Sequence, residues 1–78
     1  MNNKKFNTSD DELSVDLNEA TLAVKENRFN QALKLLEIIL NDNPDHIDTL
    51  YLASVSSRYL KKFDKSMEYI QILLANAP

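Results

Sequence analysis

Hydrophobic residues recur along the chain at the three- and four-residue spacing of an amphipathic helix, and polar turns divide them into four runs. The pattern predicts helices over residues 10–26, 31–42, 46–60 and 65–76. Residues 1–8 are polar and unpatterned, so we expect this N-terminal segment to be disordered. The order of helix, short turn and helix occurs twice around a proline break, which predicts helical hairpins over residues 9–44 and 45–78.

Residues that cap or stop helices mark the ends of these segments. Ser9 and Glu12 have the spacing of a capping box, and Asn27 tolerates the left-handed conformation that closes a helix. Pro44 stops the second segment because its nitrogen cannot donate a backbone hydrogen bond. The residues expected to cap the four helices are Ser9, Asn30, Asp45 and Asp64.

The composition of the chain supports a small helical unit. A chain of 78 residues has room for one hydrophobic core. It contains no glycine, two prolines and 44% hydrophobic residues, so few of its residues favour the tight turns of β-hairpins. We therefore expect an all-α fold.

The two hairpins align when the chain is shifted against itself so that Phe29 falls on Phe63. The same shift places Ile38 on Ile72, Leu40 on Leu74 and Pro44 on Pro78, which are identical pairs. It also places Ala32 on Ser66 and Leu36 on Ile70, which are similar pairs. Residues paired by this shift are called equivalent below. Because the matches fall at the turn, the hydrophobic stripe and the break, we predict that the two hairpins share one geometry.

A helix-turn-helix unit of this length, with an aromatic, a small, a large apolar and a closing proline residue in this order, resembles the tetratricopeptide repeat (TPR) family. The resemblance covers residues 13–78 and is strongest in the second helix of each hairpin, whereas Asp16 stands at a usually aromatic position of the first. It implies a right-handed α-α superhelix of two stacked helix-turn-helix repeats with four helices. It also implies a protein-protein interaction scaffold whose first helices line a concave face.

The concave face of such a scaffold would bind a peptide or a helix of a partner protein. By position in the repeat, its residues would be Leu17, Thr21, Val24, Lys25, Asp48, Tyr51, Val55, Arg58 and Tyr59. Tyrosine and arginine are enriched among the residues that dominate binding energies at interfaces. The alternative is that Leu17, Tyr51 and Val55 only pack between the repeats.

The last predicted helix carries a hydrophobic stripe that a following repeat would normally cover. Its exposed end face would consist of Met67, Ile70 and Leu74, with Leu73 beside them. An uncovered stripe of this kind indicates an interface, so we expect a longer protein or self-association through this face. The alternative function is therefore a homodimerisation or docking segment at the N-terminus of a larger enzyme.

Residues 48–64 also resemble TPR regions that precede sulfotransferase domains in some bacterial proteins. The residues that carry this resemblance are Asp48, Tyr51, Arg58, Tyr59 and Asp64. It implies that a larger enzyme of this kind could follow the hairpins. None of the residues that bind the sulfate donor lies in this chain, so the resemblance implies no site here.

The sequence contains no grouping of residues typical of an active site, a metal centre or a cofactor site. His46 is the single histidine, and its neighbours Asp45 and Asp48 are better explained as helix-start residues than as metal ligands. The basic cluster of Arg58, Lys61, Lys62 and Lys65 is better explained by its place at a helix C-terminus than by an acidic partner. We therefore expect no enzymatic activity, no metal and no cofactor.

Charge and the N-terminal residues limit the partners and the location. The net charge of −3 would repel phosphate backbones, so nucleic acid is not an expected partner. No stretch approaches the roughly 18 apolar residues needed to span a bilayer, and no apolar segment follows Lys4 and Lys5 as in a secretory signal. Cysteine is absent, which suits a reducing compartment. We expect a cytoplasmic protein that does not bind membranes.

Overall fold

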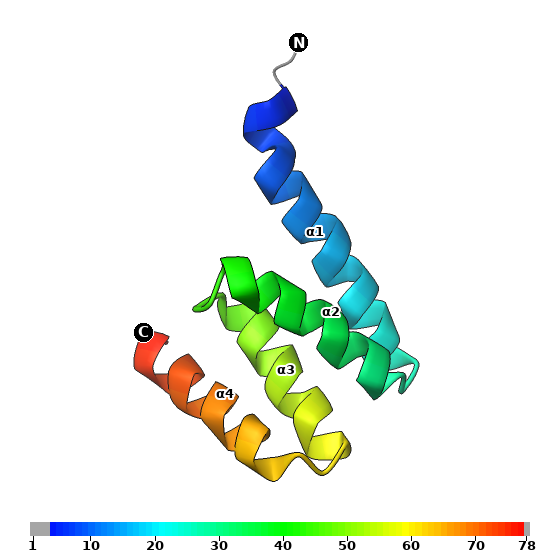
Figure 1. Cartoon of the computed structure of the whole chain (residues 1–78), viewed down its shortest axis with the longest axis vertical. Coiled ribbons are helices and arrows are strands. Elements are labelled where there is room, and N and C mark those ends of the chain that lie inside the picture. The colour runs from blue at the N-terminus through cyan, green and yellow to red at the C-terminus, as the bar shows by residue number, and fades with distance from the viewer. Residues whose placement is uncertain (1–3, 78) are drawn as a thin grey trace.

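Four α-helices follow one another along the chain in the computed structural model (Figure 1). They are α1 (Lys4–Lys25), α2 (Phe29–Asp42), α3 (Ile47–Tyr59) and α4 (Phe63–Asn76). The structure describes the backbone of residues 4–77 and the side chains of residues 15–77. Over this range there is no strand, and each helix packs against the next, so the predicted all-α fold is confirmed.

Three of the helices begin earlier than predicted. Helix α1 begins at Lys4, so Ser9 lies inside it and does not cap it. Residues 4–9 contain neither glycine nor proline, and each residue added to an existing helix gains a backbone hydrogen bond. Of the segment expected to be disordered, residues 1–3 lie outside the described range and residues 4–8 belong to α1.

The N-caps of the other helices also differ from the prediction. Helices α2 and α4 begin before their expected starts, because the turn that precedes each leads directly into the helix. Arg28 and Lys62 occupy the cap positions, and neither makes a side-chain hydrogen bond that caps its helix. Asn30 and Asp64 therefore lie in the first helical turn. Helix α3 is capped by His46, whose Nδ1 accepts a hydrogen bond from the Thr49 backbone N–H at 3.4 Å, and not by Asp45.

The turns between α1 and α2 and between α3 and α4 have the same backbone geometry. Asn27 and Lys61, which are equivalent residues, both adopt positive φ, at 63° and 64°. The next residue of each turn donates its N–H back into the preceding helix, from Arg28 to the Ala23 carbonyl at 2.7 Å and from Lys62 to the Ser57 carbonyl at 2.8 Å. The left-handed conformation predicted for Asn27 is confirmed. That of Lys61 was not predicted, because lysine has no local preference for it.

The hydrophobic core runs through the interfaces between successive helices. Helix α2 lies between α1 and α3 in Figure 1, and α3 contacts both helices of the first hairpin as well as α4. The buried core consists of Ala20, Ala23, Ala32, Leu33, Leu36, Leu50, Ala53 and Tyr69. Half of these residues are alanines, and small side chains allow helix backbones to approach closely.

Side chains on α4 also reach α2. The Tyr69 hydroxyl donates a hydrogen bond to Glu37 Oε2 at 3.4 Å, and Lys65 Nζ lies 3.5 Å from the same oxygen. Burial raises the pKa of Tyr69, and the negative charges of ionised Tyr69 and of Glu37 raise the pKa of Lys65. The three side chains therefore connect the second helices of the two hairpins.

Within the described residues, no helix combines the length and the hydrophobicity that crossing a bilayer requires.

Candidate partner-binding surface

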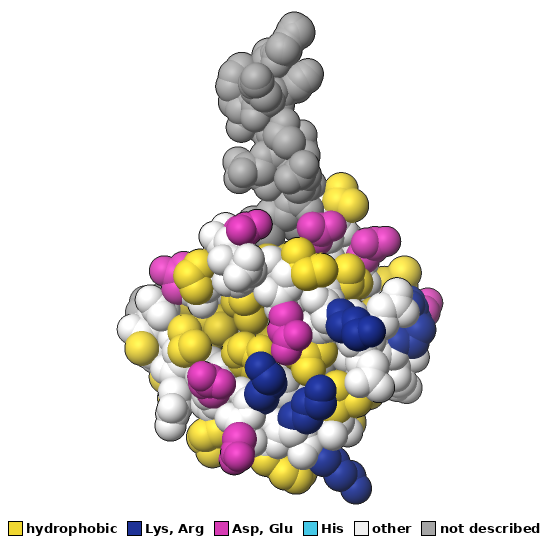
Figure 2. Space-filling model, viewed as in Figure 1, with side chains coloured by type: hydrophobic (Ala, Val, Ile, Leu, Met, Phe, Trp, Pro, Cys, Tyr) yellow, Lys and Arg dark blue, Asp and Glu magenta, His cyan; other side chains and the backbone are white. Residues whose placement is uncertain are grey.

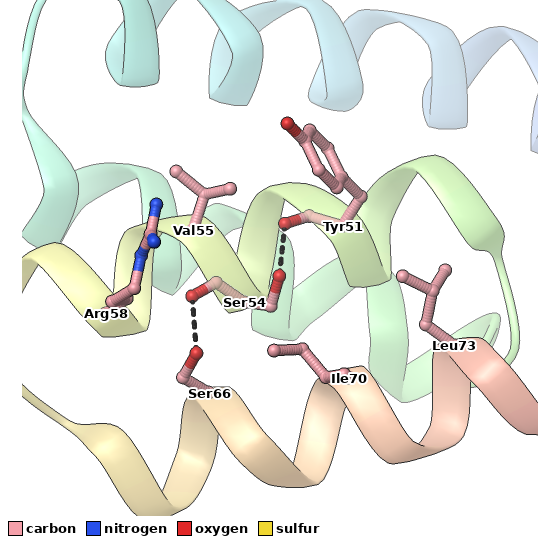
Figure 3. Close-up of a pocket in the computed structure, with 7 residues that line it drawn as sticks. All are labelled: Tyr51, Ser54, Val55, Arg58, Ser66, Ile70 and Leu73. Atoms are coloured by element: carbon pink, nitrogen blue, oxygen red, sulfur yellow. Dashed lines mark hydrogen bonds between the residues drawn. The ribbon is translucent and has the colours of Figure 1, made fainter.

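A cleft of about 280 Å³ lies between α3 and α4 (Figure 3). Its walls are formed by Tyr51, Ser54, Val55 and Arg58 from α3 and by Ser66, Ile70 and Leu73 from α4. In Figure 3 the side chain of Leu73 points from α4 toward α3. The cleft thus joins an aromatic ring, three aliphatic side chains and one guanidinium on the surface of the second hairpin.

The two serines in the wall of the cleft use their hydroxyl protons within the protein. Ser54 Oγ donates to the Tyr51 carbonyl at 2.7 Å, and Ser66 Oγ donates to the Ser54 carbonyl at 2.9 Å. Both bonds are drawn in Figure 3. Both hydroxyls therefore bind backbone carbonyls of α3.

The structure brings together three of the predicted concave-face residues, Tyr51, Val55 and Arg58, in this cleft. Tyr51 is 58% exposed, so more than half of its side chain is not covered by packing between the hairpins. Val55 is partly buried and Arg58 is exposed.

The residues predicted on α1 do not contribute to this cleft. Leu17 and Val24 are partly buried against the hydrophobic core, which supports the packing alternative for Leu17. Thr21 donates its hydroxyl proton to the Leu17 carbonyl at 2.7 Å. Lys25 is exposed at the end of α1.

Two other predicted residues lie on α3 outside the cleft. Asp48 is exposed in the first turn of α3, where a negative charge is favourable to the helix dipole. Tyr59 stacks on Phe29, with ring centroids 4.5 Å apart and an angle of 2° between the planes. The Arg58 guanidinium lies 5.7 Å from the centre of the Tyr59 ring. Tyr59 thus contacts the turn of the first hairpin.

The predicted end face lies on α4, as expected. Met67 and Leu74 are exposed, and Ile70 is partly buried and belongs to the cleft. Residues predicted for the end face and for the α3 part of the concave face therefore line the same cleft. Ser54 and Ser66 were not predicted to line it, although each lies one helical turn from a predicted residue, Tyr51 or Ile70.

The turn that joins α3 to α4 presents a second, more open depression. Lys61, Lys62, Phe63, Asp64 and Lys65 line it. The ring of Phe63 is 60% exposed there, among three lysines. Figure 2 shows one face of the molecule, on which hydrophobic side chains form a patch bordered by acidic and basic ones.

Among the described side chains, no group of three or more histidine or carboxylate residues could hold a metal ion. No protein-family model, curated protein or solved structure matches this chain. The structure itself shows a compact four-helix domain with sequential packing.

Proposed function

We propose that the chain is a protein-protein interaction module of the TPR type, which holds a peptide or a helix of a partner protein. The cleft between α3 and α4 carries this proposal. It presents an exposed tyrosine and an exposed arginine, which are residue types enriched among those that dominate binding at protein interfaces, beside three aliphatic side chains.

The paired geometry of the hairpins supports the repeat type. Helices α1 and α3 end at the equivalent residues Lys25 and Tyr59, and α2 and α4 both begin and end at equivalent residues. The positive-φ residues and the hydrogen bonds of the two turns are related by the same shift. A unit that recurs at this length and in this form is typical of stacked helical repeats.

Peptides selected from a random library on the immobilised chain provide the test. We expect selected peptides to bind in a fluorescence anisotropy titration, and Tyr51→Ala or Arg58→Ala to weaken binding at least tenfold. Val15→Ala is the control, because Val15 is an exposed residue of α1 that does not line the cleft. Circular dichroism checks that helicity is unchanged. Failure to enrich any peptide, or equal binding by Tyr51→Ala, would contradict the proposal.

A second function is favoured by the exposed apolar residues of α4. Met67 and Leu74 lie on the surface, so the hairpins could dock onto a second copy or onto an enzyme domain in the same protein. Light scattering over a range of concentrations tests the first case. A mass that doubles with concentration, and returns to that of a monomer in Leu74→Asp, would favour homodimerisation.

A further inference from the structure

Equivalent positions of the two hairpins differ in exposure. Leu33 on α2 is 4% exposed, whereas its equivalent on α4, Met67, is 56% exposed. Leu36 and Ile39 are buried, whereas their equivalents Ile70 and Leu73 are only partly buried. The hydrophobic stripe is therefore covered on α2 of the first hairpin, and its equivalent on α4 of the second hairpin is open.

Helix α3 is what covers the first hairpin. It contacts both α1 and α2, while no described helix packs on the corresponding side of α3 and α4. In the first hairpin, the residues equivalent to those of the cleft are Leu17, Ala20, Thr21, Val24, Ala32, Leu36 and Ile39. Each of them is buried or partly buried. The cleft is thus the counterpart of the surface on which α3 lies.

A comparison of α1 with α3 identifies the face that α3 turns toward the first hairpin. Thr49, Ala53 and Ser56 on α3 are fully buried. The equivalent residues of α1 are Val15, Glu19 and Leu22, which are all exposed. The side of α3 turned toward the first hairpin therefore carries fully buried small residues at positions i, i+4 and i+7, with Leu52 and Leu60 partly buried beside them.

An aromatic contact completes this interface. Tyr59 stands at position i+10 when Thr49 is position i, and it stacks on Phe29 of the first hairpin. The equivalent of Phe29 in the second hairpin is Phe63, whose exposed ring has no aromatic partner among the described residues. A helix that lies on the second hairpin as α3 lies on the first would place an aromatic residue on Phe63.

We infer that the cleft between α3 and α4 binds an α-helix of a partner protein that has the surface pattern of α3. The partner helix carries small residues at i, i+4 and i+7 and an aromatic residue at i+10, and it runs parallel to α3. In this orientation its C-terminal carbonyls approach Arg58, Lys61 and Lys62, which complement the negative end of the helix dipole. This inference rests on the proposed function and adds the surface pattern of the partner helix.

A second copy of this chain does not supply such a helix. Its own α3 is buried in its own core. Its α1 carries Glu19 and Leu22 where the pattern requires small residues, so a charge and a larger side chain would face the serines of the cleft. A separate partner protein therefore fits the cleft better than another copy.

A peptide with the sequence of residues 46–61 is the probe, because it carries the α3 pattern. Titrated into the intact chain, it should shift the NMR signals of Phe63, Ile70 and Leu73 in a saturable manner. A peptide with Ala53→Glu should bind at least tenfold more weakly, because the carboxylate would be buried against the cleft. In the chain, Phe63→Ala should weaken binding of the unaltered peptide, whereas Ile38→Ala should not. Phe63 and Ile38 are both 60% exposed, so neither change should unfold the chain.

Several outcomes would overturn the inference. One is equal binding of the Ala53→Glu peptide and the unaltered peptide. Another is NMR shifts confined to α1 and α2, which would indicate that the peptide takes the place of the chain's own α3. Self-association that Phe63→Ala abolishes would show that a second copy is the occupant. If library-selected peptides bind through Tyr51 but the residue 46–61 peptide neither binds nor competes with them, the proposed function stands and the helix pattern is wrong.

Discussion

The rings of Phe29 and Tyr59 are stacked, with centroids 4.5 Å apart and planes within 2° of parallel. Phe29 begins α2 and Tyr59 ends α3, so the contact joins the turn of the first hairpin to the second hairpin. Such a pair stabilises a fold beyond the area that it buries.

The stack predicts an energetic coupling between Phe29 and Tyr59. In urea denaturation, replacing both residues with alanine should lower the free energy of unfolding by less than the sum of the two single replacements. The difference should be about 0.5–1.5 kcal/mol. Tyr51→Ala combined with Phe29→Ala is the control and should be additive, because Tyr51 lines the cleft instead of the stack. Additive effects of Phe29→Ala and Tyr59→Ala would show that the stack contributes nothing beyond each ring alone.

Equivalent residues of the two hairpins should differ in their contribution to stability. Leu33→Ala removes a buried side chain and should reduce the free energy of unfolding by about 2–5 kcal/mol. Met67→Ala, at the equivalent position of α4, removes a side chain that is already exposed and should cost less than about 1 kcal/mol. Urea denaturation measures both values. Equal losses would mean that α3 does not cover the first hairpin more fully than any helix covers the second.

Lys61 is a site where glycine should stabilise the protein. Its φ of 64° lies in the left-handed region, which costs a non-glycine residue about 1–2 kcal/mol. After the extra unfolded-chain entropy of glycine is subtracted, Lys61→Gly should raise the free energy of unfolding by roughly 0.5–1 kcal/mol. Lys62→Gly is the matched control and should destabilise, because the φ of Lys62 is −92° and gains nothing from glycine. Thermal unfolding should show shifts of opposite sign.

The pKa shifts of Tyr69 and Lys65 predict a loss of stability at alkaline pH. Burial raises the pKa of the Tyr69 phenol, and the negative charges of ionised Tyr69 and of Glu37 raise the pKa of Lys65. Both groups hold their protons more tightly in the folded state. Their contribution to the free energy of unfolding is therefore complete below the pKa values that the two groups have in the unfolded chain. It declines as the pH rises above about 10.

Urea midpoints measured between pH 8 and pH 11 test this pH dependence. Tyr69→Phe should flatten the alkaline decline, because the buried ionisable phenol is removed. Tyr51→Phe, which removes a hydroxyl from an exposed ring of α3, should leave the decline in place. An unchanged slope in Tyr69→Phe would exclude the phenol as the source.

Local sequence determined the number of helices, their order and the position of both hairpin turns. Helix periodicity, the proline break and the tolerance of Asn27 for positive φ depend on residues that are close together in the chain. The caps were less predictable. His46 replaced Asp45, and Arg28 and Lys62 replaced Asn30 and Asp64, because the conformation of each turn decided where the helix began.

Tertiary structure decided which side chains are covered. Leu33 and Met67 have the same place in their helices, yet only Leu33 is buried, because α3 packs on the first hairpin. Tyr59, predicted on the concave face, stacks on Phe29 and keeps 60% of its surface exposed, and nothing in the sequence indicated this contact. The sequence could indicate an amphipathic face for each helix, but burial depends on which neighbour reaches that face, and that follows only from how the hairpins pack.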